Sequence, residues 1–180
     1  LWNLNALATS LTSLLESDHL IGALKQYEPE FLKQYRTIMA SKIGLEEYQP
    51  EDEPLINQLL ELMQTNNVDY TIFFRSLCAF SKNNQTVRDQ FLDREGFDGW
   101  AEKYLQRLAQ QSSTDAQRQE KMLATNPKYI LRNYMAQAAI EQAYQGDYTE
   151  VQLLLEVLQS PFDEHPDAEK YAGLPPDWAE

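Results

Sequence analysis

The chain has 180 residues, which suits one domain with a core of its own. Apolar residues make up 43% of it and charged residues 24%, and this composition, with only 6 glycines and much Leu, Ala, Gln and Glu, predicts a soluble all-α fold. The formal net charge of -13 argues against binding to nucleic acid, and no apolar segment approaches the roughly 20 residues that a membrane-spanning helix needs.

The first part of the chain is predicted to form three helices. Apolar residues within positions 1–15 recur at helical spacing and give that segment one apolar face. The pattern starts at full strength without a capping residue or an initiator Met, so we expect the chain to be the C-terminal piece of a longer protein. Ser17 can cap a short second helix, and Pro29 can open a third helix that Gly44 ends.

An acidic loop and a fourth helix are expected next. Residues 45–53 are rich in Asp and Glu, and a solvated loop explains them better than a binding site for a basic partner. Asp52 and Pro54 favour the start of a helix, which Asn66-Asn67 would end.

The middle of the chain alternates short helices with polar breaks. Asp69 favours the start of an apolar helix, and a turn is expected at residues 83–85. The two glycines within residues 96–99 indicate a junction before a helix that begins near Trp100. The polar run at residues 112–115 can both end that helix and cap the next one.

Asn126 and Pro127 have the arrangement of a helix start. Asn can cap the first turn, and Pro is tolerated at the first helical position because its missing N–H would be unpaired there anyway. The pattern predicts a helix to about Gln145 that Gly146 ends. Alanines on several sides of this helix predict that it is packed by several neighbours, as the central helix of the bundle.

The last part of the chain is predicted to be one more helix and a tail. Asp147 can cap the helix, with Glu150 at the spacing of a capping box. The prolines from Pro161 onward preclude regular helix, so residues 161–180 are expected to be extended and packed on a helical domain of residues 1–160. The aromatic residues expected to hold this tail are Phe162, Tyr171 and Trp178.

No catalytic, cofactor-binding or metal-ligating residue can be assigned from a motif. His19 and His165 lie far apart in sequence, and neither has ligand spacing to Cys, Asp or Glu. No Gly-rich phosphate-binding loop is present either. Cys78 lies among apolar residues and is expected to be an inert core residue, which fits a reducing compartment and no intramolecular disulfide.

Arg75 and Arg132 are the polar residues that attract attention. Each is expected within a strongly apolar helix, so each guanidinium should have a partner. A structural bridge to a carboxylate or to helix carbonyl groups is the favoured interpretation. The alternative is that they anchor the chain to a domain outside it.

A set of short motifs runs from one end of the chain to the other. They are Leu1-Trp2-Asn3-Leu4, Asp69-Tyr70-Thr71, Phe74-Arg75-x-Leu77, Asn126-Pro127-Lys128-Tyr129-x-Leu131-Arg132-Asn133-Tyr134, Gly146-Asp147-Tyr148, Pro161-Phe162-Asp163 and Pro175-Pro176-Asp177-Trp178. In sequence and order they are similar to the signatures of the selenoprotein O-like family, pseudokinase-fold enzymes that adenylylate other proteins. The long motif at residues 126–134 is the most specific of them.

The resemblance implies a longer protein that binds ATP and Mg²⁺ in a kinase-like fold and transfers AMP to hydroxyl side chains of proteins. The family's nucleotide- and metal-binding residues precede the motif at residues 1–4, so none is carried over to this chain. The implied partners are the upstream kinase-like domain of the same protein and the protein substrates, and the implied compartment is the cytoplasm. The candidate structural or interface residues are Arg75, Asn126, Arg132 and Trp178.

Two functions remain open at this point. The chain can be a non-catalytic helical region that completes the kinase-like domain of a longer protein. It can also be a free-standing helical module that binds a protein through an aromatic surface or the acidic loop. A first helix with exposed apolar residues would favour the longer protein, whereas a capped and covered first helix would favour the module.

Overall fold

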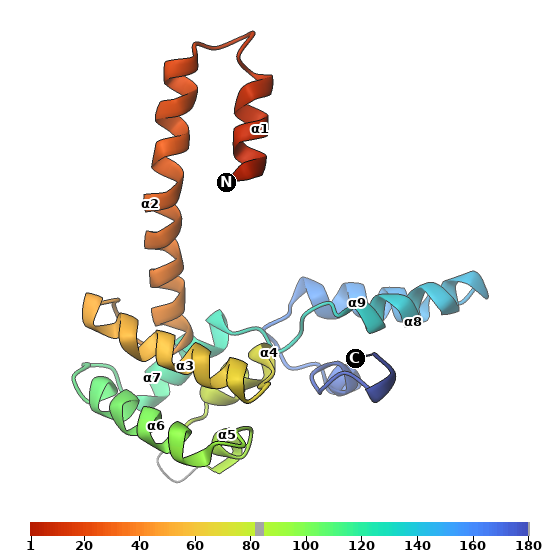
Figure 1. Ribbon diagram of the computed structural model, residues 1–180. Coiled ribbons are helices and arrows are strands. Elements are labelled where there is room, and N and C mark those ends of the chain that lie inside the picture. The colour runs from red at the N-terminus through yellow and green to blue at the C-terminus, as the bar shows by residue number, and fades with distance from the viewer. Residues whose placement is uncertain (82–84, 180) are drawn as a thin grey trace. The chain divides into compact units, whose positions relative to one another are not determined.

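The computed structural model describes residues 1–81 and 85–179, and within these ranges it contains helices and no strand, so the predicted all-α class is confirmed (Figure 1). The chain divides into two compact units, Leu1–Met39 and Ala40–Glu180. This division does not coincide with the tail boundary expected after residue 160, which stays a prediction. Of the turn expected at residues 83–85, residues 83 and 84 lie outside the described residues, whereas Gln85 begins the helix α5 (Gln85–Arg88).

The helices follow one another with short connections. The α-helices are α1 (Trp2–Ser10), α2 (Ser17–Lys42), α3 (Glu53–Thr65), α4 (Tyr70–Leu77), α5 (Gln85–Arg88), α6 (Arg94–Leu108), α7 (Asp115–Thr125), α8 (Asn133–Tyr144) and α9 (Thr149–Gln159). The 3-10 helices are η1 (Pro50–Asp52), η2 (Pro166–Tyr171) and η3 (Asp177–Ala179). In the part of the chain that the structure describes, no helix is long and apolar enough to cross a membrane.

The first unit is a helical hairpin of α1 and the larger part of α2, which continues into the second unit as far as Lys42 (Figure 1). The prediction of two helices separated at Pro29 is wrong, because α2 passes through this proline without ending. A proline inside a helix removes one backbone hydrogen bond. Stacking at four-residue spacing spans the site and offsets part of this cost: the Phe31 ring lies 5.8 Å from Tyr27 and 6.3 Å from Tyr35.

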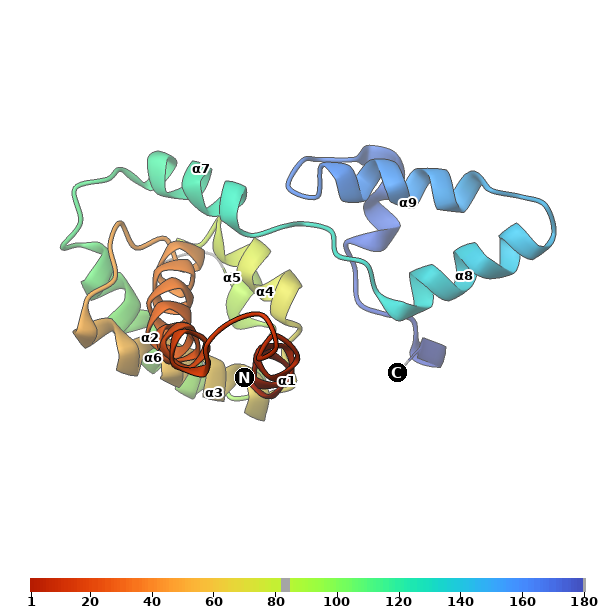
Figure 2. The ribbon, with the colours of Figure 1, turned by 90° about the horizontal axis from the view of Figure 1, so that it is seen from above.

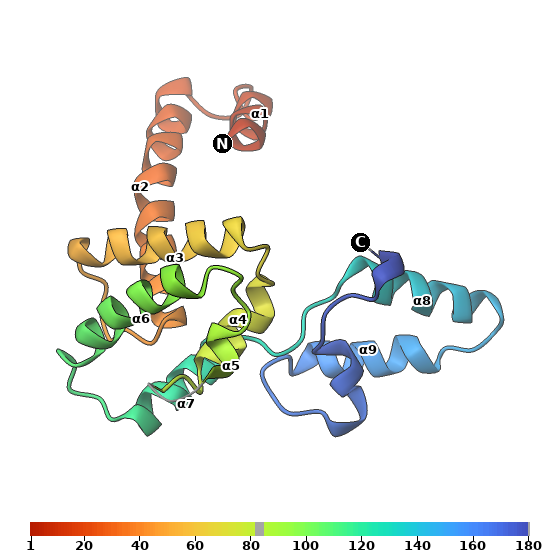
Figure 3. The same cartoon turned by 60° about the horizontal axis from the view of Figure 1, so that its bottom comes forward.

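The larger core of the second unit is aromatic and lies where α3, α4, α5 and α6 pack together (Figure 3). The Trp100 ring stacks on Tyr104 with centroids 4.9 Å apart. Both rings satisfy their polar atoms inside the core: the indole N–H of Trp100 donates to the carbonyl oxygen of Leu55 at 3.0 Å, and the Tyr104 hydroxyl donates to that of Ile43 at 2.7 Å. The remaining aromatic members are Phe73, Phe74, Phe80, Phe91 and Phe97.

Several helix boundaries agree with the capping signals. Asp69 caps α4 by accepting a hydrogen bond from the backbone N–H of Ile72 at 3.0 Å, and Thr114 caps α7. Gly44 ends α2 at a φ of +73°, as expected for a glycine at a helix C-terminus. The prediction of a junction at residues 96–99 is wrong, because Asp93 caps α6 and this helix runs through both Gly96 and Gly99.

The second core of this unit is formed by α8, α9 and the tail, with Tyr129, Met135, Leu154, Val157 and Tyr171 among its buried residues. The prediction of a helix that starts at Asn126 is wrong. The helix α7 ends before Asn126, the residues that follow are extended, and α8 begins only at Asn133 (Figure 2). The backbone N–H groups of Lys128 and Tyr129 donate instead to the carbonyl oxygen of Pro161, at 2.8 and 3.1 Å.

Two packing predictions for this region need correction. The helix α8 is not central to the fold, because it buries only Met135 and Ala139 and leaves Ile140 and Tyr144 exposed. Of the three aromatic residues expected to hold the tail, Tyr171 is buried, whereas Phe162 and Trp178 are 40% and 67% exposed. The tail also contains two short 3-10 helices rather than being extended throughout.

The acidic loop is only partly solvated. Asp52 is 1% exposed, and its carboxylate accepts hydrogen bonds from the Arg107 guanidinium on α6 at 2.6 and 3.2 Å. The backbone N–H of Gln49 donates to the same carboxylate at 2.8 Å. Asp52 therefore ties the loop to the core, which corrects the expectation of a solvated loop at this position.

Candidate functional site

A polar junction connects the two cores of the second unit, and Asn126 is its buried centre. The side chain of Asn126 is fully buried, and its amide donates to the carbonyl oxygen of Lys42 at 2.8 Å. Its amide oxygen accepts from the Lys42 ammonium at 3.1 Å. A buried amide needs such partners to offset its desolvation. Asn126 thus fixes the end of α7 against the end of α2.

Arg75 contributes the widest set of contacts to this junction. One guanidinium nitrogen, Nη1, donates to the carbonyl oxygens of Leu123 and Asn126, both at 3.1 Å. The other, Nη2, donates to the carbonyl oxygen of Phe162 at 3.1 Å and to the carboxylate of Glu164 at 2.9 Å. Arg75 is therefore a structural bridge from α4 to the end of α7 and to the tail, which is the favoured of its two interpretations.

Lys128 and Glu164 extend the junction toward the tail. The Lys128 ammonium donates to the carboxylates of Glu164 and Glu169. Hydrogen bonds from Lys128 and then from Arg75 lower the pKa of the Glu164 carboxyl, so it stays charged at neutral pH. Burial works against the charge of Lys128, but the hydrogen bonds to Glu164 and Glu169 outweigh it and raise the pKa of this ammonium.

Lys42 and Cys78 form the interior side of the same junction. The Lys42 ammonium lies 5.3 Å from the centroid of the Tyr70 ring and 5.1 Å from that of Phe74, and burial lowers its pKa. Cys78 is buried as predicted, and the Asn126 amide donates to its sulfur at 3.6 Å. Burial raises the pKa of the Cys78 thiol, which keeps it protonated and unreactive.

Arg132 and Trp178 lie outside this junction. The Arg132 Nη1 donates to the Asp69 carboxylate at 2.8 Å, so the residue that caps α4 also holds the segment before α8. Arg132 precedes α8 instead of lying within an apolar helix, which corrects the expectation for its surroundings. Trp178 makes an edge contact with Tyr134, with ring centroids 6.2 Å apart.

The junction has the chemistry of a support rather than of a reacting site. Its cations and carboxylates pair with one another or with carbonyl groups, and no nucleophile is activated by a neighbouring base. Within residues 1–81 and 85–179, no three His, Cys, Asp or Glu side chains are placed to hold a metal ion. No chemical step is assigned to the residues of the junction.

Sequence reasoning missed part of the junction. Lys42, Lys128 and Glu164 also belong to it, through their contacts with Asn126, Arg75 and one another. The only available signal was that Lys128 and Glu164 lie within or beside the motifs at residues 126–134 and 161–163. No local sequence pattern predicts that these two motifs contact each other in the fold.

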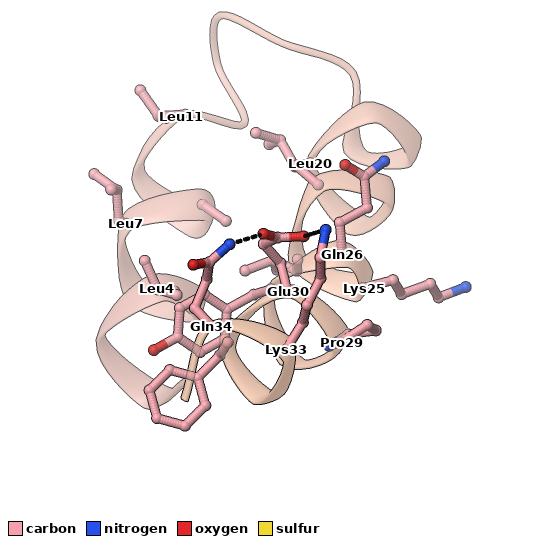
Figure 4. Close-up of a pocket in the computed structure, with 15 residues that line it drawn as sticks. Leu4, Leu7, Leu11, Leu20, Lys25, Gln26, Pro29, Glu30, Lys33 and Gln34 are labelled. Carbon is pink, nitrogen blue, oxygen red and sulfur yellow. Dashed lines mark hydrogen bonds and ion pairs between the residues drawn. The ribbon is translucent and has the colours of Figure 1, made fainter. Parts of the chain in front are cut away.

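A second candidate site is an apolar groove within the first unit, between α1 and α2 (Figure 4). Leu4, Leu7 and Leu11 line it from α1 and the turn that follows, and Leu20 and Leu24 line it from α2. Lys33 and Gln34 lie at one side, where both interact with Glu30 (Figure 4). The rest of the lining is predominantly hydrocarbon, so the groove suits an apolar occupant.

The fold and these two sites define an acidic, all-α protein whose charged residues connect helices and whose first unit presents an apolar groove. The family model described as "Protein adenylyltransferase SelO" matches residues 1–159. The chain belongs to this family, which confirms the resemblance seen in its motifs.

Proteins called "Protein nucleotidyltransferase YdiU" match nearly the whole chain. The one from Vibrio vulnificus (strain CMCP6) is 46% identical over 99% of the chain and 38% of its own length. The one from Pseudomonas fluorescens (strain Pf0-1) is 46% identical over 98% of the chain and 37% of its own length. The chain thus spans less than two fifths of the length of these curated relatives.

Proposed function

We propose that this chain is the helical C-terminal region of a protein nucleotidyltransferase and that it braces a kinase-like catalytic domain formed by another part of the protein. ATP and Mg²⁺ are bound by that domain, and AMP is transferred there to hydroxyl side chains of other proteins. The chain described here carries no catalytic residue. Its role is to complete the catalytic domain and hold it in its active shape.

The observation that carries this proposal is the exposed apolar surface of the first unit. The helix α1 buries no residue, and Trp2 and Leu7 are 82% and 56% exposed. On α2, Phe31 and Ile38 are 52% and 50% exposed. Burying a fully exposed apolar side chain contributes about 1.5–3 kcal/mol, and a half-exposed one retains a corresponding part of this gain. A hairpin of this composition is therefore suited to packing against another apolar surface.

The length of the relatives supports this assignment of the surface. More than three fifths of the relatives' length has no counterpart in this chain, so a full family member contains enough further residues to cover the groove. The alternative, a free-standing interaction module, would be favoured by a first helix with a covered apolar face. The exposure of α1 favours a covering domain in the same protein instead.

A chimera tests this role. In it, the present chain replaces the matching 38% of the Vibrio vulnificus protein, and labelling of proteins from radiolabelled ATP is measured. We expect the chimera to label proteins, and we expect Leu7→Glu to reduce labelling because it places a charge in the groove. Leu92→Glu is the matched control, since Leu92 is 90% exposed in the second unit and should tolerate the change.

The isolated chain supplies the complementary measurement. We expect no binding of Mg²⁺-ATP in calorimetry and no labelling of proteins. Leu7→Glu should leave the melting temperature of the isolated chain nearly unchanged, because Leu7 is already largely exposed there. Tight Mg²⁺-ATP binding by the isolated chain, or equal labelling by the Leu7→Glu and Leu92→Glu chimeras, would contradict the proposed role.

A further inference from the structure

The hairpin of α8 and α9 has a second exposed apolar surface. Ile140 and Tyr144 lie on one side of α8 at four-residue spacing, and they are 50% and 89% exposed. Val151 and Leu155 of α9 and Tyr148, which directly precedes it, follow one another at helical spacing and are also exposed. The opposite sides of both helices bury their apolar residues in the second core. We call these five exposed residues the hairpin surface.

The segment that carries the hairpin surface is acidic, and an ion pair to it comes from Lys170 in the tail. Residues 133–160 include Glu141, Asp147, Glu150 and Glu156 but no Lys, Arg or His. Of these carboxylates, Glu150 is paired with Lys170. The other three form no ion pair with any residue in the described ranges 1–81 and 85–179.

Hydrogen bonds hold one of these carboxylates in place at the turn between the helices. The side chain and the backbone N–H of Thr149 donate to the Asp147 carboxylate at 2.6 and 2.9 Å, and these bonds lower its pKa. Tyr144 and Tyr148 flank this turn on either side. Apolar contact area and fixed negative charge therefore occur together at the tip of the hairpin.

We propose that the hairpin surface docks a basic amphipathic segment of another protein. Apolar side chains of that segment cover Ile140, Tyr144 and Leu155, while its Lys or Arg residues face Glu141, Asp147 and Glu156. The charge selects this occupant: phosphate backbones and anionic lipid headgroups are repelled, and a second copy of the chain would place carboxylate against carboxylate. The hairpin surface shares no residue with the α1–α2 groove. A result that contradicts one of the two proposals therefore leaves the other untouched.

Peptide binding to the 180-residue chain tests this site. The probe is a short fluorescein-labelled peptide with Leu at every third or fourth position and Lys elsewhere, followed by fluorescence anisotropy. Two comparison peptides carry Glu in place of Lys, or Ser in place of Leu. We expect the Lys/Leu peptide alone to bind and its affinity to fall as salt is raised.

Variants locate the binding. Tyr144→Ser should lower the affinity at least tenfold, and Asp147→Asn should lower it less and weaken the salt dependence. Tyr144 is almost fully exposed, so its replacement should not disturb folding. Leu92→Ser removes an equally exposed apolar side chain elsewhere and should leave binding unchanged.

Five results would overturn the proposal. Equal binding of the Glu/Leu peptide would show that apolar contact acts alone, and equal binding of the Lys/Ser peptide would show that charge acts alone. Unchanged binding by the Tyr144→Ser variant would place the site elsewhere. Self-association of the chain that Tyr144→Ser abolishes would make this surface a contact between copies. Failure of the chimera to bind the peptide would mean that the rest of the protein covers the surface.

Discussion

Replacing Arg132 by Ala should destabilise the second unit by about 2 kcal/mol, since a hydrogen bond to a charged group contributes ~1.5–3 kcal/mol to stability. The bond lost is the one of 2.8 Å from Arg132 to Asp69, whose side chains are 16% and 17% exposed. The Asp69 carboxylate keeps the bond from the Ile72 N–H, so α4 remains capped and the loss should not exceed this range. Urea unfolding followed by circular dichroism measures the difference in free energy of unfolding.

A double-mutant cycle separates this ion pair from its surroundings. Asp69→Asn keeps a good helix cap but removes the charge, so Arg132→Ala should cost much less in that background. Arg132→Lys is the matched control, because it keeps the charge and loses only the guanidinium geometry. Additive losses from the two single changes would refute the pairing.

The pH dependence of this pair has a definite sign. Burial works against the charge of Asp69, but hydrogen bonds from Arg132 and the backbone outweigh it and leave the pKa below the usual 3.8. A carboxyl whose pKa is lowered by folding stabilises the folded state above its unfolded pKa and loses this contribution as the pH falls through the folded value. The difference between wild type and Arg132→Ala should therefore be full at pH 7 and shrink below pH 3.8. An equal difference in free energy of unfolding at pH 7 and below pH 3.8 would refute the electrostatic explanation.

Three further changes have expected outcomes. Arg107→Ala should cost about 3–5 kcal/mol in urea unfolding because it leaves the Asp52 carboxylate buried without its partner, and a loss below 1 kcal/mol would contradict this. Gly44→Ala should lower the melting temperature by several degrees, since φ is +73° and the added Cβ would lie 2.6 Å from the Met122 sulfur; an unchanged value would show that the turn adapts. Glu164→Gln should speed hydrogen exchange of the Lys128 and Tyr129 amides, which donate to Pro161, and unchanged exchange would mean that the junction does not depend on Glu164.

Local capping signals predicted most helix ends correctly because their physics is contained in a few neighbouring residues. Asp69 and Thr114 accept hydrogen bonds from backbone groups three residues onward, and Gly44 adopts the left-handed conformation that ends α2. The spacing of apolar residues likewise predicted an all-α chain. None of these features requires a contact between distant segments.

The errors arose where distant segments decide the outcome. Asn126 and Pro127 have the local pattern of a helix start, but the Asn126 side chain is bound to Lys42 and the next backbone N–H groups to Pro161. Tertiary contacts therefore replace the expected first turn. Pro29 shows the opposite error, since α2 continues through a residue that usually ends a helix.

The candidate site was predictable only in part for the same reason. The need of Arg75 for a partner followed from its apolar neighbours, whereas its actual partners come from α7 and the tail. The groove between α1 and α2 could not be seen as a site, because a periodic apolar face looks the same whether it is covered or exposed. Only a three-dimensional structure distinguishes a covered apolar face from an exposed one.

Hydrogen exchange of residues 2–39 tests the central claim most directly. The comparison is between the isolated chain and the chimera with the Vibrio vulnificus protein. If α1 and α2 pack against the catalytic domain, their amides should exchange much more slowly in the chimera, while exchange in the aromatic core around Trp100 should change little. Equal exchange of α1 and α2 in both proteins would contradict the claim that this hairpin braces the catalytic domain.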